Sequence, residues 1–116
     1  MFTLDQSERY WYPVTVELVD AEGRKKKFDF DGSFERLPED ELKEFFRERE
    51  EGETKLSDRD VVERVFRGWR KIQTADGADV EVNDENRERL LKTHPVQGCI
   101  VKAWLKSIGI EGKSKN

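Results

Sequence analysis

The sequence predicts an α+β domain, in which an N-terminal β-hairpin over residues 13–30 precedes about four short helices on a small aromatic-rich core. The first observation is that apolar residues alternate with polar ones up to Phe34 and then recur at helical spacing. The second is the length of 116 residues, which suffices for one domain with one modest core. We therefore expect a single domain over residues 1–110, with its helical part at 38–108, and a flexible polar tail at 111–116.

The composition indicates a folded chain with a very polar surface. Charged residues make up 41% of the chain, against about 25% in an average protein, and hydrophobic residues only 34%. The hydrophobic residues nevertheless include seven Phe, three Trp and two Tyr, many of them at periodic positions. Each aromatic side chain buries a large apolar area, so a small core can be built from few of them.

Two alternating runs with a turn between them indicate the hairpin. Val14 and Val16 alternate with polar residues in the first run, and Phe28 and Phe30 do so in the second. A turn containing glycine separates the runs. The basic run at 24–27 is interpreted as a solvated turn and strand face, because acidic residues flank it.

Residues 1–11 show no clear periodicity and are expected to form an arm with aromatic anchors, Tyr10 and Trp11 among them. Two roles are open for these anchors. Terminal aromatic residues more often pack onto the chain's own core, and the alternative is self-association with a second copy. Trp11 is therefore a candidate partner-binding residue.

A short amphipathic helix is predicted at 58–68. Ser57 is a suitable N-cap, and Asp60 three residues later completes a capping-box-like pair. Apolar residues then recur at one-face helical spacing, and Gly68 stands where a left-handed stop residue is expected. The apolar residues of this face are Val61, Val62, Val65, Phe66 and Trp69.

Three further helices are expected near 38–50, 84–92 and 95–108, each beginning at a residue that favours a helix N-terminus. A short strand or extended segment is expected around 80–82, where valines alternate with an acidic residue. The helices and the hairpin should share one core. Its expected members are Val62, Val65, Phe66, Leu90, Leu91, Ile100 and Trp104.

The sequence offers no evident catalytic or metal-binding constellation. A metal site needs several convergent ligands, and the chain has one His and one Cys. His94 and Cys99 could be a base and a thiol nucleophile, but Cys99 lies on an apolar helix face, where a structural thiol is the commoner role. The glycines are scattered singly and form no phosphate-binding loop. We expect no enzymatic activity and no cofactor.

Charge and hydropathy limit the kinds of partner and the cellular compartment that we expect for this chain. A net charge of −4 disfavours a nucleic-acid binder that neutralises phosphates. No apolar run approaches the length of a membrane span, and the N-terminus lacks the features of a signal peptide. A single cysteine suits a reducing compartment. We expect a cytoplasmic protein with neither nucleic acid nor membrane as a partner.

Four stretches carry a resemblance to a known family. Residues 30–37 are Phe-Asp-Gly-Ser-Phe-Glu-Arg-Leu, and residues 65–72 are Val-Phe-Arg-Gly-Trp-Arg-Lys-Ile. The third stretch, residues 82–91, begins with Val-Asn-Asp-Glu-Asn and ends with two leucines. The fourth, residues 95–104, begins with Pro-Val and ends with Ala-Trp, and the chain then closes with Gly-Lys-Ser-Lys-Asn. In their order and spacing, over roughly two thirds of the chain, they resemble the tail assembly chaperones of long-tailed, siphovirus-like bacteriophages.

The resemblance implies a non-enzymatic protein of a phage or prophage. Such chaperones bind the tape measure protein, keep it soluble and help to recruit tail tube subunits. They act in the host bacterial cytoplasm and are absent from the mature virion. In many phages, ribosomal frameshifting near the end of the gene makes a longer form, and the last residues of this chain are compatible with one. Residues 1–12 and 47–56 fall outside the resemblance.

Other functions stay open beside this one. The main alternative is a small acidic regulatory protein that binds a DNA-binding protein or occupies its site, and an uncharacterised enzyme is a third. Neighbouring genes for a tail tube and a tape measure protein would favour the chaperone.

The candidate partner-binding residues include the end of the predicted central helix. Trp69 is either a cap on the core or a partner-facing anchor, and the flanking Arg70 and Lys71 give the second role the composition of an interface hot spot. With the arm residue, the candidates are Trp11, Trp69, Arg70 and Lys71.

Overall fold

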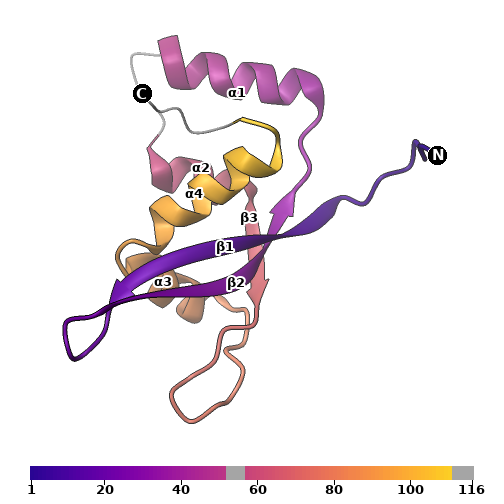
Figure 1. Ribbon diagram of the computed structural model, residues 1–116. Coiled ribbons are helices and arrows are strands. Elements are labelled where there is room, and N and C mark those ends of the chain that lie inside the picture. The colour runs from indigo at the N-terminus through magenta and orange to yellow at the C-terminus, as the bar shows by residue number, and fades with distance from the viewer. Residues whose placement is uncertain (52–56, 111–116) are drawn as a thin grey trace.

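The computed structural model describes residues 1–51 and 57–110, without the side chains of residues 48–51. Within these residues it contains a three-stranded antiparallel sheet, in the order β1-β2-β3, and four helices, which confirms the predicted α+β class. The predicted flexible tail at 111–116 lies outside the described residues. The elements are β1 (Arg9–Val19), β2 (Lys25–Glu35), α1 (Glu39–Glu51), α2 (Asp58–Val65), β3 (Phe66–Arg70), α3 (Asp84–Lys92) and α4 (Val96–Ser107) (Figure 1).

The hairpin extends further at both ends than the predicted 13–30. β1 and β2 pair without interruption over all eleven residues of each strand. Residues 9–11, expected in an arm, are therefore strand residues, and so is Phe34, expected in the loop before the helix at 38–50. Pro13 lacks a backbone donor, but it does not end the strand because β1 lies at the edge of the sheet.

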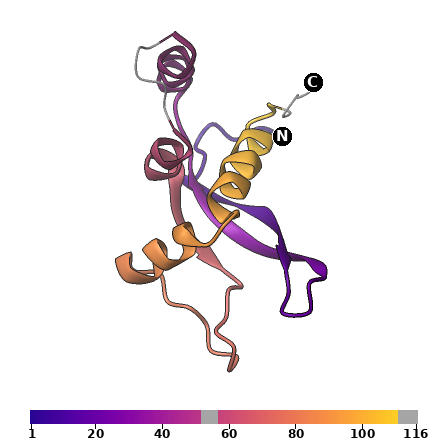
Figure 2. The same ribbon diagram turned by 90° about the vertical axis from the view of Figure 1, so that its left-hand side faces the viewer.

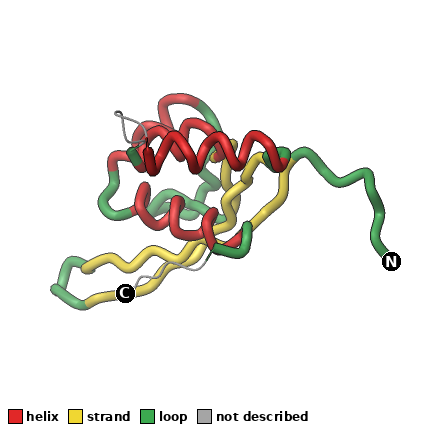
Figure 3. Tube along the Cα trace, turned by 90° about the horizontal axis from the view of Figure 1, so that it is seen from above, coloured by secondary structure: helices red, strands yellow, loops and turns green. Residues whose placement is uncertain are grey.

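Helices cover one face of the sheet. Even positions of β1 and β2 point to the core, where Val14, Val16, Phe30 and Phe34 are buried. Seen from above, the helices lie to one side of the hairpin (Figure 3), and α4 lies along β1 (Figure 2). The opposite face, which we call the outer face, consists of the odd positions of β1 and β2, Gly68 and Arg70 of β3, and Lys71, which follows β3 and binds Asp31.

The helix predicted at 58–68 is shorter, because the chain passes directly from α2 into β3 at Phe66. Phe66 and Trp69 are three residues apart, a spacing typical of a helix face, yet both are buried side chains of a strand. The β2–β3 register shifts so that Arg67 is an extra, bulged residue, and this bulge brings positions 66 and 69 to the same face. Gly68 is thus a strand residue, and the prediction of a left-handed stop there is wrong.

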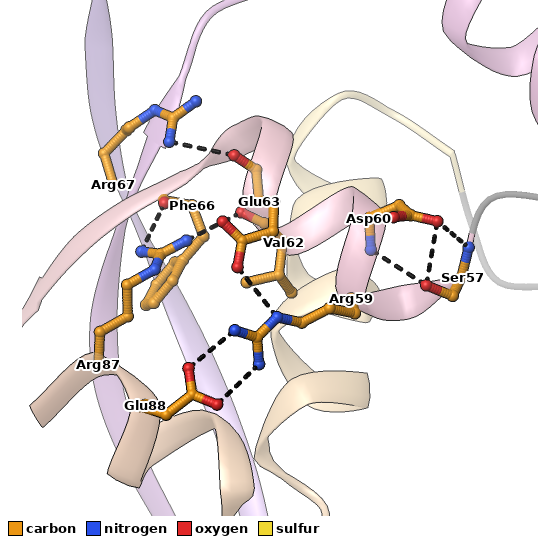
Figure 4. A network of polar contacts seen from close by, with 9 residues as sticks. All are labelled: Ser57, Arg59, Asp60, Val62, Glu63, Phe66, Arg67, Arg87 and Glu88. Carbon is orange, nitrogen blue, oxygen red and sulfur yellow. Dashed lines mark hydrogen bonds and ion pairs between the residues drawn. The ribbon is translucent and has the colours of Figure 1, made fainter. Parts of the chain in front are cut away.

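Side chains close both ends of α2 (Figure 4). At its start, the backbone N–H of Asp60 donates to Ser57 Oγ at 3.2 Å, and that of Ser57 donates to Asp60 Oδ2 at 2.9 Å, which confirms the predicted capping box. At its end, the guanidinium of Arg87 from α3 donates to the carbonyl oxygens of Phe66 at 2.8 Å and Val62 at 3.2 Å. The Val62 carbonyl also accepts the backbone N–H of Phe66, so the guanidinium adds a second hydrogen bond there and reaches the next carbonyl beyond the helix, that of Phe66.

The core joins the sheet to the helices through aromatic rings. Trp104 of α4 meets Phe45 edge-on, with ring centroids 5.6 Å apart, and stacks on Phe46 at 5.9 Å. These contacts attach α1 to α4, and an ion pair between Glu41 and Arg64 joins α1 to α2, although the ribbon of α1 lies away from the other helices (Figure 1). The other predicted core residues that are buried are Val62, Val65, Phe66, Leu91 and Ile100.

One predicted core residue is only half-buried. Leu90 lies with Ile72 and Val80 along a hollow beside the segment between β3 and α3. Of the two forms expected around 80–82, the extended segment is observed, with a single β-bridge between Gln73 and Asp79.

We predict that Gly32→Ala destabilises the fold, because Gly32 leaves room for two core rings. A Cβ at this position would lie 3.0 Å from the ring of Phe34 and 3.2 Å from that of Phe66. Overpacking of this kind costs about 1–3 kcal/mol. Urea unfolding gives the change in the free energy of unfolding.

Gly68→Ala in the neighbouring strand is the matched control. Its Cβ would approach Val82 at 3.6 Å and Ser33 at 4.0 Å, which are ordinary contacts. We expect a change in the free energy of unfolding below about 0.5 kcal/mol. Equal effects of the two substitutions would contradict the packing argument.

Candidate partner-binding surface

Three of the four candidate residues meet on the outer face of the sheet, although they come from distant parts of the chain. Trp11 lies on β1, Arg70 ends β3 and Lys71 follows it. Both cations reach the same oxygen of Asp31 on β2, with Arg70 Nε at 2.9 Å and Lys71 Nζ at 3.3 Å from Oδ2. The sheet therefore gathers them into one cluster on an exposed surface.

The fourth candidate, Trp69, belongs to the core. Its side chain is 4% exposed, and its ring stacks against that of Phe66 with centroids 6.3 Å apart. The indole Nε1–H donates to the carbonyl oxygen of Val80 at 3.0 Å, so the polar end of the ring is satisfied inside the protein. Trp69 is therefore a cap on the core and not a partner-facing anchor.

The strand register orders the outer face into cross-strand rows. Trp11 lies opposite Ser33, and Ser33 lies opposite Gly68. Val82 continues this row, since it is the residue nearest to Gly68 on that side. The small residues Ser33 and Gly68 therefore lie between the two exposed apolar side chains of the row. Trp11 is 46% exposed and Val82 is 48% exposed.

Arg70 holds the Trp11 ring in place. The guanidinium carbon lies 4.2 Å from the ring centroid, within the range of a cation–π contact, which contributes about 0.5–1 kcal/mol at an exposed site. The same guanidinium is fixed by its hydrogen bond to Asp31. A tryptophan held in this way presents a large apolar surface to solvent at little further cost in side-chain entropy on binding.

The carboxylate of Asp31 is the centre of the cluster. Its side chain is only 15% exposed, whereas those of Arg70 and Lys71 are 52% and 68% exposed. The hydrogen bond from Arg70, together with Lys71, holds the pKa of Asp31 below its usual value, against the opposing effect of burial. Lys71 has a left-handed backbone with φ of 71°, an unfavourable conformation for a residue with a side chain, at the point where β3 ends.

The charged groups of the arrangement are paired with one another. The carboxylate of Asp31 is committed to two cations, and no group of three or more potential metal ligands occurs among the residues that the structure describes.

Elsewhere, burial raises the pKa of the Cys99 thiol, which lowers its thiolate fraction and disfavours the thiol nucleophile considered above. Within the described ranges, the helices are all too short or too polar to cross a membrane.

Sequence reasoning found the exposed members of this surface but missed its centre. Asp31, Ser33 and Gly68 were not candidates, because their role depends on the pairing of β2 with both neighbours. The available signal was the alternation around Phe30, which already places Asp31 on the face opposite the core. Phe2 and Leu4 of the N-terminal arm are 78% and 83% exposed and do not pack on the core.

Comparisons of the chain with protein-family models, with curated proteins and with solved structures find no match.

We predict that Asp31→Asn lowers stability in a pH-dependent way. Because the folded-state pKa of Asp31 is lowered, its ion pairs stabilise the fold above the unfolded-state pKa of about 3.9, and this contribution is lost as the pH falls through the folded-state pKa. The variant should unfold at a lower temperature than the wild type at pH 7, and the difference should shrink below about pH 4. Glu17→Gln, which removes another carboxylate of the outer face without breaking an ion pair to Arg70, is the control. The prediction would be contradicted if the unfolding temperatures of the Asp31 variant and the wild type differed by the same amount at every pH from 7 to 3.

The backbone at residue 71 allows a second test. Lys71→Ala and Lys71→Gly both remove the ion pair to Asp31, but only glycine adopts the left-handed conformation without strain. We expect the glycine variant to be more stable than the alanine variant by about 1 kcal/mol in urea unfolding. An alanine variant as stable as the glycine variant would show that the backbone relaxes there.

Proposed function

We propose that this protein is a tail assembly chaperone of a long-tailed phage or prophage, which binds the tape measure protein and helps to recruit tail tube subunits without catalysing a reaction. One observation carries the proposal. The four segments that resemble the family form one connected unit, and their exposed side chains contribute most of the cluster around Asp31. Segments 30–37 and 65–72 contain the paired strands β2 and β3, while 82–91 and 95–104 contain most of α3 and α4.

The physical properties of the chain suit this role. A tape measure protein is long, and its apolar helix faces would aggregate before the tail tube covers them. A small domain with a rigid tryptophan on an exposed sheet face can cover such a surface by helix-in-groove or helix-on-sheet contact. Its own surface is highly charged, with 41% charged residues, and would keep the complex soluble in the host cytoplasm.

The acidic net charge of −4 also favours the alternative, a regulator that binds a DNA-binding protein or occupies its site. Such a regulator would use its negative surface. The cluster around Trp11 instead presents Arg70 and Lys71, and this favours the chaperone.

Co-expression with the tape measure protein of the same phage tests the proposal. We expect the full chain to co-purify with the tape measure protein and to raise its soluble fraction, because binding covers apolar helix faces. The tape measure protein expressed alone is the control. Insolubility of the tape measure protein in both cases, with no co-purification, would overturn the proposal, and capture of a DNA-binding repressor would support the regulator.

A further inference from the structure

We infer that the outer face of the sheet is a docking surface for an acidic amphipathic helix of the partner. This inference rests on the proposed function and names the chemistry of the segment that is bound. Its basis is a charge asymmetry, because five cations and four carboxylates lie on this face of a chain whose net charge is −4. The cations are Arg9, Lys25, Lys27, Arg70 and Lys71, and the carboxylates are Glu17, Asp29, Asp31 and Glu35, the last of which binds Arg64 and Arg67.

The carboxylates of the face are largely engaged, and some of its cations are not. Asp31 binds both Arg70 and Lys71, and Asp29 accepts a hydrogen bond from Thr15 Oγ1 at 2.7 Å. Lys25 and Lys27, at exposed positions near the end of the hairpin, form no ion pair within the described part of the chain. Glu17 lies opposite Lys27 in the register but forms no ion pair with it in the described part of the chain, so both lysines stay available to a negatively charged partner.

The spacing of these charges fits a helix that lies along the strands. Arg70 is level with Asp31, and Lys27 lies four residues further along β2, a distance of about 13 Å. At 1.5 Å per residue, this distance corresponds to about nine residues of an α-helix. Carboxylates roughly nine residues apart on one helix face would therefore reach both cationic ends of the surface.

The apolar side chains of the face fit the other half of an amphipathic helix. Trp11 and Val82 lie in one row, separated by Ser33 and Gly68, which add no bulk between them. The partly exposed Trp11 ring would be the anchor, since Trp and Arg are enriched among residues that dominate binding energy. Because this row runs across the strands, a helix that lies along them would cross the row and cover Trp11 with an apolar residue near one of its ends.

Nucleic acid is the less suitable occupant of the same cations. Glu17 and Asp29 lie among the lysines and would repel a phosphate backbone, whereas separate side-chain carboxylates can avoid them. A protein segment also makes better use of the apolar row. The argument therefore favours the acidic helix, and nucleic acid is an outcome of the test.

The test measures the binding of fluorescent overlapping peptides from the tape measure protein to the full chain by anisotropy. We expect at least one acidic, helix-forming peptide to bind, and its affinity to fall as salt rises. Trp11→Ala should weaken binding about tenfold, and the double variant K25Q/K27Q should weaken it and reduce the salt dependence. The double variant K102Q/K106Q changes the net charge equally, at exposed positions of α4 outside the outer face, and should leave the affinity within about twofold.

The possible outcomes distinguish a failure of the docking surface from a failure of the proposed chaperone function. Unchanged unfolding midpoints of the variants ensure that lost binding is not lost folding. Binding of the tape measure protein that is unaffected by Trp11→Ala and K25Q/K27Q would overturn the docking surface and leave the chaperone role intact. Failure of both the peptides and the whole tape measure protein to bind would overturn the proposed function itself. A third outcome is that no peptide binds but a duplex oligonucleotide does, and that K25Q/K27Q abolishes its binding. This would overturn the acidic helix as the occupant.

Discussion

The guanidinium of Arg87 lies where α2 becomes β3 without a loop, and the arrangement of the sheet depends on this contact. It donates to the carbonyl oxygens of Val62 and Phe66 and lies 5.3 Å from the centroid of the Phe66 ring. Burial lowers the pKa of Arg87, so the fold bears a desolvation cost to keep the charge there. Hydrogen bonds from a charged donor offset that cost and tie α3 to the carbonyls at the end of α2. They permit an abrupt change from helix to strand.

The abrupt change determines which side chains reach each face of the sheet. Because β3 begins at Phe66 and Arg67 is bulged, Phe66 and Trp69 enter the core while Gly68 and Arg70 point outward. Arg67 is then free to bind Glu35 at 2.9 Å and the carbonyls at the end of α2. The position of Arg70 beside Trp11 therefore follows from a contact made by α3 on the opposite side of the sheet.

Local patterns in the sequence predict the parts of this fold that depend on near neighbours. The alternation of Val14 and Val16 identifies the hairpin, and the pair Ser57 and Asp60 identifies the start of α2, because both signals act within a few residues. The end of α2 could not be predicted in the same way. Its cap, Arg87, comes from another helix, and a bulged strand places Phe66 on the core face at the spacing of a helix. The surface around Asp31 was missed for a related reason, since only the register of three strands brings its members together.

The two tryptophans of the sheet show that face, rather than residue type, decides the role of a side chain here. Trp69 is satisfied by a backbone carbonyl and buried, whereas Trp11 is held in solvent by a cation. Along β1 the core residues and the outer-face residues alternate, so Val14 and Trp11 point to opposite faces of the sheet. The inner side chains form the core, whereas the outer ones include both the proposed docking residues and the ion pairs of Asp31, which also contribute to stability. Outer residues that do not contact Asp31 can therefore vary with the partner while the inner set keeps the sheet in place.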